Sequence, residues 1–284
     1  MKFLTAVSKN AAFNLREAWK KASVRRSNYF KPQGGTVGNK KLYTRAEFEN
    51  LRLESAKEMV KDQELRQEAL KVLVRADHYR WIHQTNWLGE PVLNLPQDMF
   101  ALQEIIFKTR PRFIIELGVA WGGSLLFYST LMEVLGGERI IGVDIYLPED
   151  LKERLASHGK LSERLILING SSIEQDSLSR VKSIVGNCRE VMVVLDSYHT
   201  HDHVLKELHL YSPLVGKGFY LICGDTIVED MPKPAERPWG PGNSPKTARD
   251  AFLRENDRFE VDERLENKLL FTCNPGGYLK AIKE

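Results

Sequence analysis

Hydrophobic and polar positions along the chain follow two different patterns, and the change comes near residue 112. Residues 44–80 carry apolar side chains at helical spacing, with Thr44 placed to cap a helix and Glu47 three residues further on. This pattern predicts a helix over 44–80. A loop with two prolines follows, and then a second predicted helix near 97–109.

From residue 112 onward, short continuous apolar runs alternate with helix-sized segments. The predicted strands lie at 112–117, 139–144, 164–170, 190–196 and 218–225, and the predicted helices at 123–135, 149–157, 173–185 and 203–212. Such alternation indicates a parallel sheet covered by helices on both faces. Residues 258–266 and 268–282 look like two strands joined without a helix. The predicted fold class is therefore α/β: a Rossmann-like, mostly parallel sheet with an antiparallel C-terminal hairpin, preceded by N-terminal helices.

Composition and charge refine this organisation. With 42% hydrophobic and 28% charged residues, the chain has the composition of a globular protein. Residues 1–41 hold ten Lys and Arg against one acid, whereas the whole chain carries only +3. A glycine-rich stretch at 31–40 closes this segment. We expect a basic N-terminal arm at 1–41, a helical extension at 42–95 and the main α/β domain at 96–284.

The basic arm has apolar residues at helical spacing, among them Leu4, Val7, Ala11 and Leu15. The pattern fits a helix on an anionic membrane surface or an acidic partner, but we favour the alternative, an arm packed on its own body or on a second subunit. The three cysteines are scattered and the longest apolar runs are strand-sized, so we expect a cytoplasmic protein. Peripheral contact with the inner face of the membrane is the alternative. We expect a homo-oligomer and no nucleic-acid partner.

The first predicted strand runs into a glycine-rich turn that opens a helix. Its candidate binding residues are Glu116, Gly118, Val119, Ala120, Gly122, Gly123 and Ser124. Glycines allow close approach of a ligand to the backbone, and a helix N-terminus offers unpaired N–H groups. A dinucleotide fingerprint would need glycine where Ala120 stands, and a phosphate-binding Gly-Lys-Ser/Thr loop is absent. The spacing suits a ligand that carries an amino acid and a nucleoside without a pyrophosphate.

The next two strands end in polar residues of the same kind of site. Asp144 ends the second strand, and an acid there can accept hydrogen bonds from both ribose hydroxyls. Ser171 and Ser172 follow the third strand and are small enough to line an adenine edge. Together with the glycine-rich turn, they predict an adenosine-type cofactor.

The fourth and fifth strands deliver acids and histidines. Asp196 and Asp225 each follow a buried strand, and two adjacent carboxylates suit Mg²⁺ or Mn²⁺ better than zinc. His199, His201 and His203 lie just beyond Asp196. A zinc site is disfavoured because no cysteine is near and a helix would put His199 and His203 on one face while His201 turns away. At least one histidine is a candidate catalytic base; the others would have hydrogen-bonding roles.

Four segments in combination resemble a known family over roughly residues 80–284. They are "TNWLGEPVLNLPQDMFALQEIIFKTRPRFIIELGVAWGGSLLFY", "IIGVDI", "LDSYHTHDHVLKELHLYSPLVGKGFYLICGDT" and "NPGGYLK". The resemblance is to the cephalosporin hydroxylase family, which includes the methyltransferase component of cephamycin biosynthesis and rhamnosyl O-methyltransferases. It implies an S-adenosylmethionine-dependent O-methyltransferase on a Rossmann-like sheet, with a magnesium ion held by carboxylates.

Carried onto this chain, the resemblance assigns roles to individual residues. The Glu116–Ser124 turn would hold the methionine part of the cofactor, and Asp144 the ribose. Asp196 and Asp225 match acidic positions at the metal, and Asp196 is also a candidate catalytic and cofactor-binding residue. His199 and His203 match the two histidines of the family's Asp-Ser-Asp-His-Ser-x-x-His-Val run, so His199 is the first-choice base and His203 the second. The implied acceptor is a small molecule or glycan, with a sugar hydroxyl in a polysaccharide, glycolipid or glycosylated metabolite as the best interpretation.

Two positions depart from the family pattern. Gly224 stands where the family has Glu, and Tyr198 where it has a second Asp, so at least one expected metal carboxylate is missing. The acids that could replace it are Asp202, Glu229 and Asp230. This loss motivates an alternative function, a catalytically degenerate partner subunit that binds S-adenosylmethionine. A nicotinamide oxidoreductase is disfavoured by the glycine spacing, and a hydroxylase by the lack of a two-histidine, one-carboxylate iron site.

Two residues are candidates for acceptor binding. Residues 227–252 are rich in proline and glycine and follow Asp225 directly, so they could form a lid or an ordinary surface loop. Trp239 in that segment is placed to stack on a sugar ring. His201 is the second candidate substrate contact.

Overall fold

The computed structural model describes residues 36–37, 40–233 and 236–284, and it divides into two compact units, Met1–Ala56 and Lys57–Glu284. Of the predicted basic arm at 1–41, residues 1–35 and 38–39 lie outside the described residues, and with them the apolar positions of its predicted membrane or subunit contact. The division between the units falls inside a helix. Among the described residues, no helix is long and apolar enough to cross a membrane.

The predicted helix over 44–80 is two helices. β1 (Thr36–Val37) pairs with β2 (Lys40–Lys41), and α2 (Arg45–Lys61) follows. Thr44 and Glu47 form the predicted cap of α2, because each side chain accepts a hydrogen bond from the other's backbone N–H. Asp62 then interrupts the helix and caps α3 (Gln63–Asp77) by accepting from the N–H of Leu65.

A short hairpin occupies the predicted proline-containing loop. After the single turn η1 (Trp81–Gln84), β3 (Thr85–Trp87) pairs with β4 (Glu90–Val92). Leu88 and Gly89 connect the strands with positive φ angles of 51° and 95°. A two-residue connection with both φ angles positive matches the twist of the strands, and the glycine makes it accessible. The sequence analysis missed this hairpin because each of its strands has only three residues.

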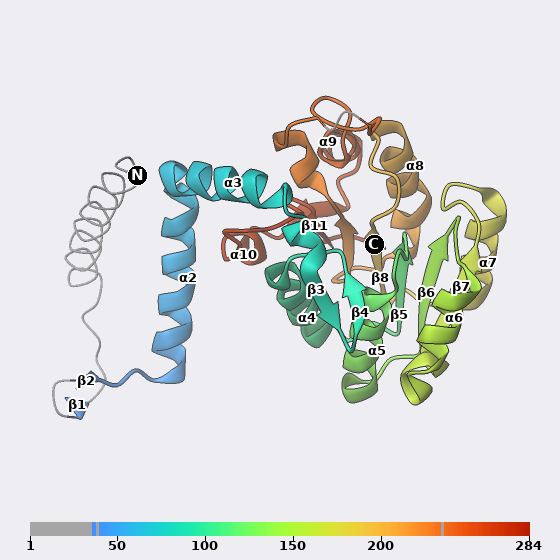
Figure 1. Ribbon diagram of the computed structural model, residues 1–284. Helices are drawn as coiled ribbons and strands as arrows, with labels where there is room; N and C mark the ends of the chain where they lie inside the picture. Colours follow the sequence, from blue (N-terminus) through green and yellow to red (C-terminus); the bar gives the residue numbers. More distant parts are fainter. Residues whose placement is uncertain (1–35, 38–39, 234–235) are drawn as a thin grey trace, which may run out of the picture. The chain divides into compact units, whose positions relative to one another are not determined.

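The second unit is built on the predicted sheet (Figure 1). Its strands in chain order are β5 (Phe113–Leu117), β6 (Arg139–Asp144), β7 (Leu165–Asn169), β8 (Val191–Leu195), β9 (Tyr220–Cys223), β10 (Phe259–Val261) and β11 (Tyr278–Ala281). Their order across the sheet is β10-β11-β9-β8-β5-β6-β7. β5 through β9 run parallel, and β11 is antiparallel to both of its neighbours. This arrangement confirms the predicted α/β fold class, with its antiparallel C-terminal strands.

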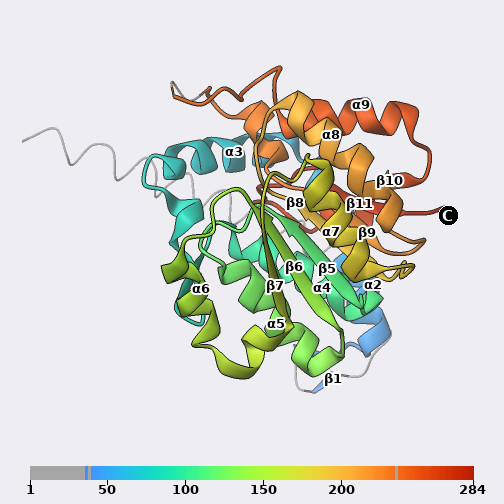
Figure 2. The ribbon, with the colours of Figure 1, turned by 90° about the vertical axis from the view of Figure 1, so that its right-hand side faces the viewer.

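Helices cover both faces of this sheet (Figure 2). The layer on one face consists of α4 (Pro96–Thr109), α5 (Gly123–Leu135), α6 (Glu149–Ala156) and α10 (Glu263–Glu266), and the layer on the other consists of α7 (Gln175–Val185), α8 (His201–Tyr211) and α9 (Pro245–Glu255). Alternate residues of each strand serve the two layers. In β5, Ile114 joins the first core while Phe113 and Ile115 join the second. Because both faces are buried, the strands read as continuous apolar runs in the sequence.

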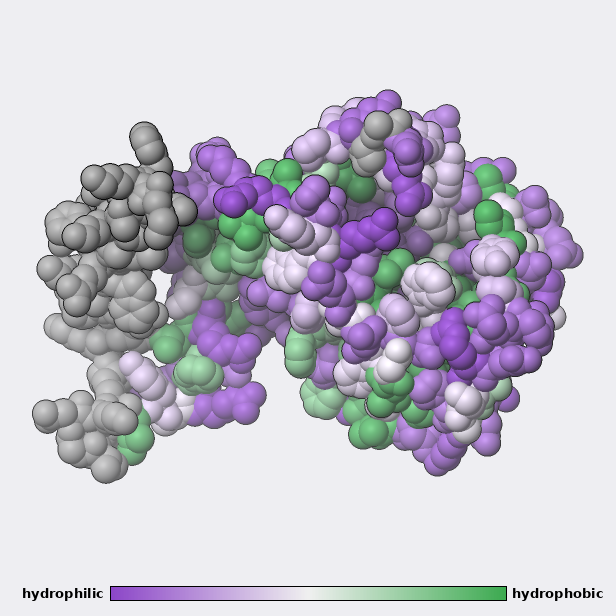
Figure 3. Space-filling model, in the orientation of Figure 1, coloured by the Kyte–Doolittle hydropathy of each residue, from purple (hydrophilic) through white to green (hydrophobic). Residues whose placement is uncertain are grey.

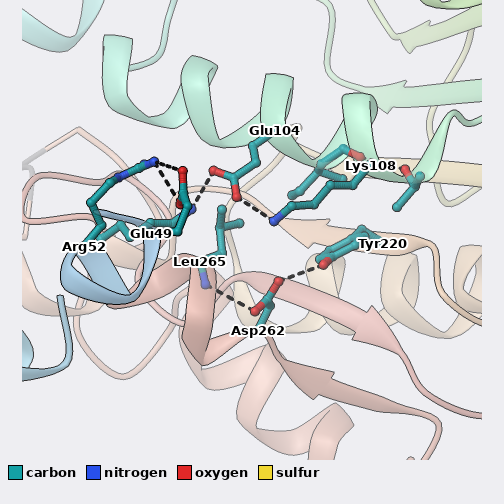
Figure 4. A network of polar contacts seen from close by, with 10 residues as sticks. Glu49, Arg52, Glu104, Lys108, Tyr220, Asp262 and Leu265 are labelled. Atoms are coloured by element: carbon teal, nitrogen blue, oxygen red, sulfur yellow. Dashed lines mark hydrogen bonds and ion pairs between the residues drawn. The ribbon is translucent and has the colours of Figure 1, made fainter. Parts of the chain in front are cut away.

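The C-terminal tail differs from the prediction. The strand expected over 268–282 begins only at Tyr278, because residues 272–273 bind the buried carboxylate of Asp98 instead. That carboxylate also accepts from the Tyr278 hydroxyl. A one-turn helix, α10, stands between β10 and β11. Asp262 ties it to the sheet, accepting from the Leu265 N–H and from the Tyr220 hydroxyl (Figure 4).

The surface of the second unit is mixed. The face seen in Figure 3 is a mosaic of hydrophilic and smaller hydrophobic areas. Ile145 and Tyr146 are 75% and 72% exposed, and both follow the end of β6. They border the carboxyl edge of the parallel strands, where ligands bind in sheets of this kind.

Candidate functional site

A cavity of about 890 Å³ opens at the carboxyl edge of the parallel strands. Its wall includes residues from the turns after β5, β6, β7, β8 and β9. The order of the strands reverses between β5 and β8, so the cavity lies at the topological switch point of the sheet. The rest of the wall comes from the end of α3, from η1, from residues 91–94 and from several described residues of the segment after Asp225, among them Lys233 and Trp239.

The glycine-rich turn after β5 is shaped by its neighbours in the fold. Gly118 has φ +95°, and a Cβ there would lie 2.0 Å from the backbone oxygen of Asp196. Gly123 packs against β4, where a Cβ would lie 2.3 Å from the backbone oxygen of Pro91. Among the predicted cofactor positions, only Glu116, Gly122 and Gly123 do not line the cavity. Close packing of the chain therefore requires glycine at Gly118 and Gly123 whether or not a ligand is bound.

Asp144 connects this turn to the end of β6. One carboxylate oxygen accepts from the N–H of Val119 at 2.8 Å and of Ala120 at 3.4 Å, and the other accepts from Tyr146 at 2.9 Å. Ala120 has a left-handed backbone with φ 46°, although it is not glycine. Each carboxylate oxygen has more than one lone-pair direction, so Asp144 keeps acceptor capacity toward the cavity that it lines.

Glu116 lies one layer behind the turn. It is 2% exposed, and its two oxygens accept from Ser124 Oγ at 2.7 Å and from the Tyr128 hydroxyl at 3.0 Å. Burial raises the pKa of Glu116 to about 7, although the two hydrogen bonds oppose that rise. Glu116 does not line the cavity, so in this structure it supports the turn through Ser124.

His203 belongs to a compact polar cluster with Glu207 and does not join Asp196 and Asp225. Its Nε2 lies 3.1 Å from both Ser172 Oγ and Ser197 Oγ, and 3.2 Å from Glu207 Oε1. Both serines donate to that same oxygen of Glu207, a fully buried residue whose other oxygen has no hydrogen-bond partner among the described residues. The cluster joins the loops after β7 and β8. This geometry does not favour His203 as the base that serves an acceptor beside Asp196.

Asp196, His199 and Asp225 converge on one point of the cavity wall. One possible ligand atom from each lies within 4.8 Å of the other two, and they form the only such group of His, Cys, Asp and Glu in the described part of the chain. His199 Nε2 is 3.4 Å from Asp225 Oδ2. Burial, and then the charge of Asp225, raises the pKa of Asp196 well above its ordinary value. A cation bound between the carboxylates would offset this repulsion.

The loop after β9 fixes the position of Asp225. Its backbone is left-handed with φ 51°, and its N–H donates to Asn274 Oδ1 at 2.9 Å. Beside it, the N–H of Gly224 donates to the oxygen of Leu195 at 2.9 Å. A Cβ on Gly224 would lie 2.6 Å from that oxygen and 3.2 Å from Asp196 Oδ1. The backbone at 224 therefore has no room for a side chain as it stands.

None of the three acids expected as replacements joins the group. Glu229 accepts from the N–H of Gly242 and from Ser244 Oγ, so it closes its own loop. Asp202 and Asp230 are exposed. This geometry does not support any of the three as a replacement for the missing carboxylate.

Trp239 lies beside the converging group. Its ring meets the edges of His199 and Tyr198 at centroid distances of 5.1 and 5.3 Å, and the Arg237 guanidinium lies 4.9 Å from its centroid. It lines the cavity as predicted. His201 does not: its ring Nδ1 lies 2.9 Å from Thr247 Oγ1 on α9, and its N–H donates to Asn243. This geometry does not support the predicted substrate contact of His201.

The predicted lid and helical histidine pair also differ from the structure. From Pro245 the segment 227–252 is α9, and residues 226–230 form the short turn η4 (Thr226–Asp230). Because α8 begins at His201, His199 lies in the preceding loop and is not a helical neighbour of His203. The sequence placed all three histidines in one stretch, and the structure sends them to three different partners.

The sequence analysis missed one wall of the cavity. Val74, His78 and Ile82 contribute to it from α3 and η1, which the prediction assigned to a separate extension. Asn94 also lines the cavity, and its buried side-chain oxygen has no hydrogen-bond partner among the described residues. Nothing in a single sequence distinguishes Asn94 from an ordinary loop residue, because its exposure to the cavity depends on how the chain folds back.

Comparison with known proteins places this geometry in context. A family model described as Rhamnosyl O-methyltransferase/CmcI matches residues 79–282. The Rhamnosyl O-methyltransferase of Mycobacterium tuberculosis (strain ATCC 25618 / H37Rv) is 27% identical over 218 residues, covering 72% of this chain and 84% of the relative. That of Mycobacterium leprae (strain TN) is 27% identical over 220 residues, covering 72% and 90%.

Solved structures with similar chains share little sequence with this one. A structure described as "cmcI-D160 Mg-SAM" has a TM-score of 0.49 and 19% identity over 70% of this chain and 77% of that chain. The O-methyltransferase TomG from Streptomyces achromogenes, in complex with SAM, has a TM-score of 0.48 and 15% identity over 76% and 90%.

Proposed function

Because the chain belongs to the Rhamnosyl O-methyltransferase/CmcI family of S-adenosylmethionine-dependent O-methyltransferases, we propose that it methylates a hydroxyl group of a sugar. The observation that carries the proposal is the single cavity whose wall holds both the Gly118–Asp144 region and the Asp196, His199 and Asp225 group. A cofactor and an acceptor bound there would meet above the ends of β5 and β8.

The cofactor half of the cavity suits the two ends of S-adenosylmethionine. Asp144 offers its remaining acceptor direction to a ribose hydroxyl, and Ser171 borders the place for the adenine. The buried oxygen of Asn94 is an unused acceptor for a donor such as the α-ammonium group. These contacts would hold the sulfonium in one orientation, which an in-line displacement needs.

In the reaction, the acceptor oxygen attacks the methyl carbon. An oxygen–carbon bond forms, the carbon–sulfur bond breaks with its electron pair going to sulfur, and S-adenosylhomocysteine and a methyl ether result. The hydroxyl proton must leave, because an alcohol is a weak nucleophile until it is deprotonated. His199 is the imidazole beside the two acids, with its side chain 13% exposed. Its Nε2 lone pair can accept that proton or bind a cation, and it cannot do both at once.

The donor set fits a divalent cation. Two carboxylates and an imidazole can approach one point, although the third carboxylate of the family pattern is absent at Gly224. A cation held by Asp196 and Asp225 would lower the pKa of a hydroxyl bound beside it. The protein's own residues would orient that hydroxyl and keep water from the methyl group.

The sugar acceptor rests on two observations. The relatives are named for rhamnosyl methylation, at 27% identity. In this chain Trp239 borders the cavity next to His199, and an indole face can stack on the apolar face of a sugar ring. The aromatic surface would place one ring hydroxyl at the converging group.

Cofactor binding is the first test. Calorimetric titration of S-adenosylhomocysteine, with Mg²⁺ and then with EDTA, should show micromolar binding by the wild-type protein. Asp144→Ala should weaken it about 10- to 100-fold, since hydrogen bonds to a charged group contribute roughly 1.5–3 kcal/mol. Asp202→Ala, which removes an exposed acid on α8, is the matched control and should bind like wild type. No binding by the wild-type protein under either condition would overturn the proposal.

Methyl transfer is the second test. A labelled methyl group should be transferred to rhamnosides and related glycosides. The matching acceptors that lack the sugar should remain unlabelled. Cofactor binding without transfer to any glycoside would favour the partner subunit instead. Equal transfer to acceptors without a sugar would contradict the acceptor class.

A further inference from the structure

The converging group is a mixed set of donors, with two oxygens and one nitrogen. Asp196 comes from the end of β8, His199 from the loop that follows, and Asp225 from the end of β9. His199 Nε2 faces Asp225 Oδ2 at 3.4 Å, and the three ligand atoms lie within 4.8 Å of one another. Ligands on one small cation are separated by about 3 Å or more when each bond is near 2.1 Å. The observed spacing needs only small side-chain movements to reach that geometry.

We propose that His199 is a metal ligand that takes the place of the carboxylate missing at Gly224, and that the site therefore selects Mn²⁺ or Co²⁺ over Mg²⁺. The proposal deepens the proposed function and rests on it. It assigns the Nε2 lone pair of His199 to the cation, so that His199 is not the base.

Gly224 shows that the site is built around the absence of a third carboxylate. A Cβ at 224 would lie 2.6 Å from the oxygen of Leu195 and 3.2 Å from Asp196 Oδ1. Both contacts are tighter than ordinary van der Waals contact, and the first is with backbone that the Gly224 N–H itself binds. A glutamate could enter only if the ends of β8 and β9 moved apart. The fourth-strand acid thus occupies the space beside the missing side chain.

The ring of His199 is held where a ligand has to be. Its edge contact with Trp239, at 5.1 Å and an interplanar angle of 84°, limits its rotation. Asp225 is fixed opposite by its left-handed backbone and its bond to Asn274. A non-glycine residue in that conformation is strained, and such strain is concentrated at functional sites. Among the described residues, the carboxylate of Asp196 has no hydrogen bond or ion pair to another side chain, so its oxygens remain available.

The donor set decides which cation fits. Mg²⁺ prefers oxygen ligands in octahedral geometry, and it gains little from imidazole. The affinity of sites with nitrogen donors rises from Mn²⁺ to Co²⁺ and beyond in the first transition row. Replacing one anionic ligand by a neutral one also removes a charge that would attract a hard ion. Two carboxylates and one imidazole therefore favour a transition ion.

The test measures metal ligation directly. Metal-stripped protein is loaded with Mn²⁺, and pulsed electron paramagnetic resonance detects coupling of the ion to ¹⁴N. Competition with Mg²⁺, followed by calorimetry, gives the selectivity. The variants are His199→Ala and, as the matched control, His201→Ala, which removes a histidine two residues away that binds Thr247. Circular dichroism checks that both variants are folded.

The wild-type protein and His201→Ala should show ¹⁴N coupling and bind Mn²⁺ at least about tenfold more tightly than Mg²⁺. His199→Ala should lose the coupling and bind Mn²⁺ about 10- to 100-fold more weakly, while its affinity for Mg²⁺ changes much less. Bound Mn²⁺ without ¹⁴N coupling in wild type, coupling that persists in His199→Ala, equal affinity for Mg²⁺, or no Mn²⁺ binding would each overturn the inference.

The result is separable from the proposed function. Titration of S-adenosylhomocysteine into the metal-stripped protein reports on the cofactor site independently of the metal site. Cofactor binding and transfer activity together with an oxygen-only metal site would leave the methyltransferase in place and refute the role of His199. Loss of cofactor binding with intact nitrogen ligation would do the reverse.

Discussion

Glu116→Gln should change how the stability of the protein depends on pH. The Glu116 carboxyl lies behind the glycine-rich turn after β5. Burial raises its pKa from 4.5 to about 7, although the hydrogen bonds from Ser124 and Tyr128 oppose that rise. Glutamine has nearly the same shape. Hydroxyl groups both donate and accept, so Ser124 and Tyr128 can pair with an amide as well. The substitution therefore removes the titration with little change in packing.

The sign follows from the raised pKa. Below the unfolded pKa of 4.5 both states are protonated, and the carboxyl carries no penalty. As pH rises toward about 7, the unfolded chain ionises while the folded chain keeps its proton, so stability is lost. The difference between a pKa of 4.5 and one of about 7, at 1.36 kcal/mol per pKa unit, corresponds to about 3 kcal/mol, most of which falls between pH 5 and pH 8.

Urea unfolding at a series of pH values, on wild type and variant without cofactor, measures this effect. The stability of Glu116→Gln relative to wild type should rise by roughly 2 to 3 kcal/mol from pH 5 to pH 8, with similar denaturant slopes. Most other titrating groups are common to both proteins and cancel in the difference, whereas Asp144 and Asp196, whose charges interact with that of Glu116, cancel only in part. Glu266→Gln is a companion variant, because burial also raises the pKa of Glu266 to about 7. Parallel pH curves for wild type and Glu116→Gln would refute the reasoning.

Three further substitutions test other parts of the structure. Gly118→Ala places a Cβ 2.0 Å from the backbone of Asp196 at a φ of +95°, so we expect the free energy of unfolding in urea to fall by more than about 2 kcal/mol. Binding of S-adenosylhomocysteine should also weaken, and unchanged stability would contradict that packing. Asp98→Ala leaves the buried Thr272 and Tyr278 hydroxyls without their acceptor, so unfolding should lose about 3 kcal/mol, and a loss below 1 kcal/mol, also by urea unfolding, would count against the network. Trp239→Leu should raise the KM for a glycoside about tenfold, as expected for loss of an aromatic contact of about 1.4 kcal/mol, while the KM for S-adenosylmethionine stays within a factor of two; equal effects on both would remove Trp239 from the acceptor site.

The sheet was predictable because both of its faces are buried. Continuous apolar runs mark β5, β6, β7, β8 and β9 to within two residues at each end, and no other local structure competes for them. The β3–β4 hairpin and the loop over 272–277 were not predictable. The hairpin strands are too short to show a period, and the loop is held out of the sheet by Asp98, which is more than 170 residues away along the chain.

The candidate site divides in the same way. The polar residues at the strand ends are evident in the sequence, and parallel strands bring such ends to one edge. The partners of the three histidines are not evident, because the start of α8 at His201 decides which way each ring turns. Asn94 and the wall from α3 and η1 enter the site through long-range packing, which leaves no local pattern.

The spacing of residues along the chain was enough to predict the alternation of strands and helices, the acids that end the strands and the family resemblance, because each of these is a local pattern. Which of those residues come into contact depends on the tertiary structure. In the fold, His203 contacts Glu207, His201 contacts Thr247 and His199 contacts Asp225, and the neighbouring backbone leaves no room for a side chain at Gly224. The physical reason is that a side chain's chemistry depends on partners brought near it by the packing of distant segments, and that packing depends on the whole chain at once.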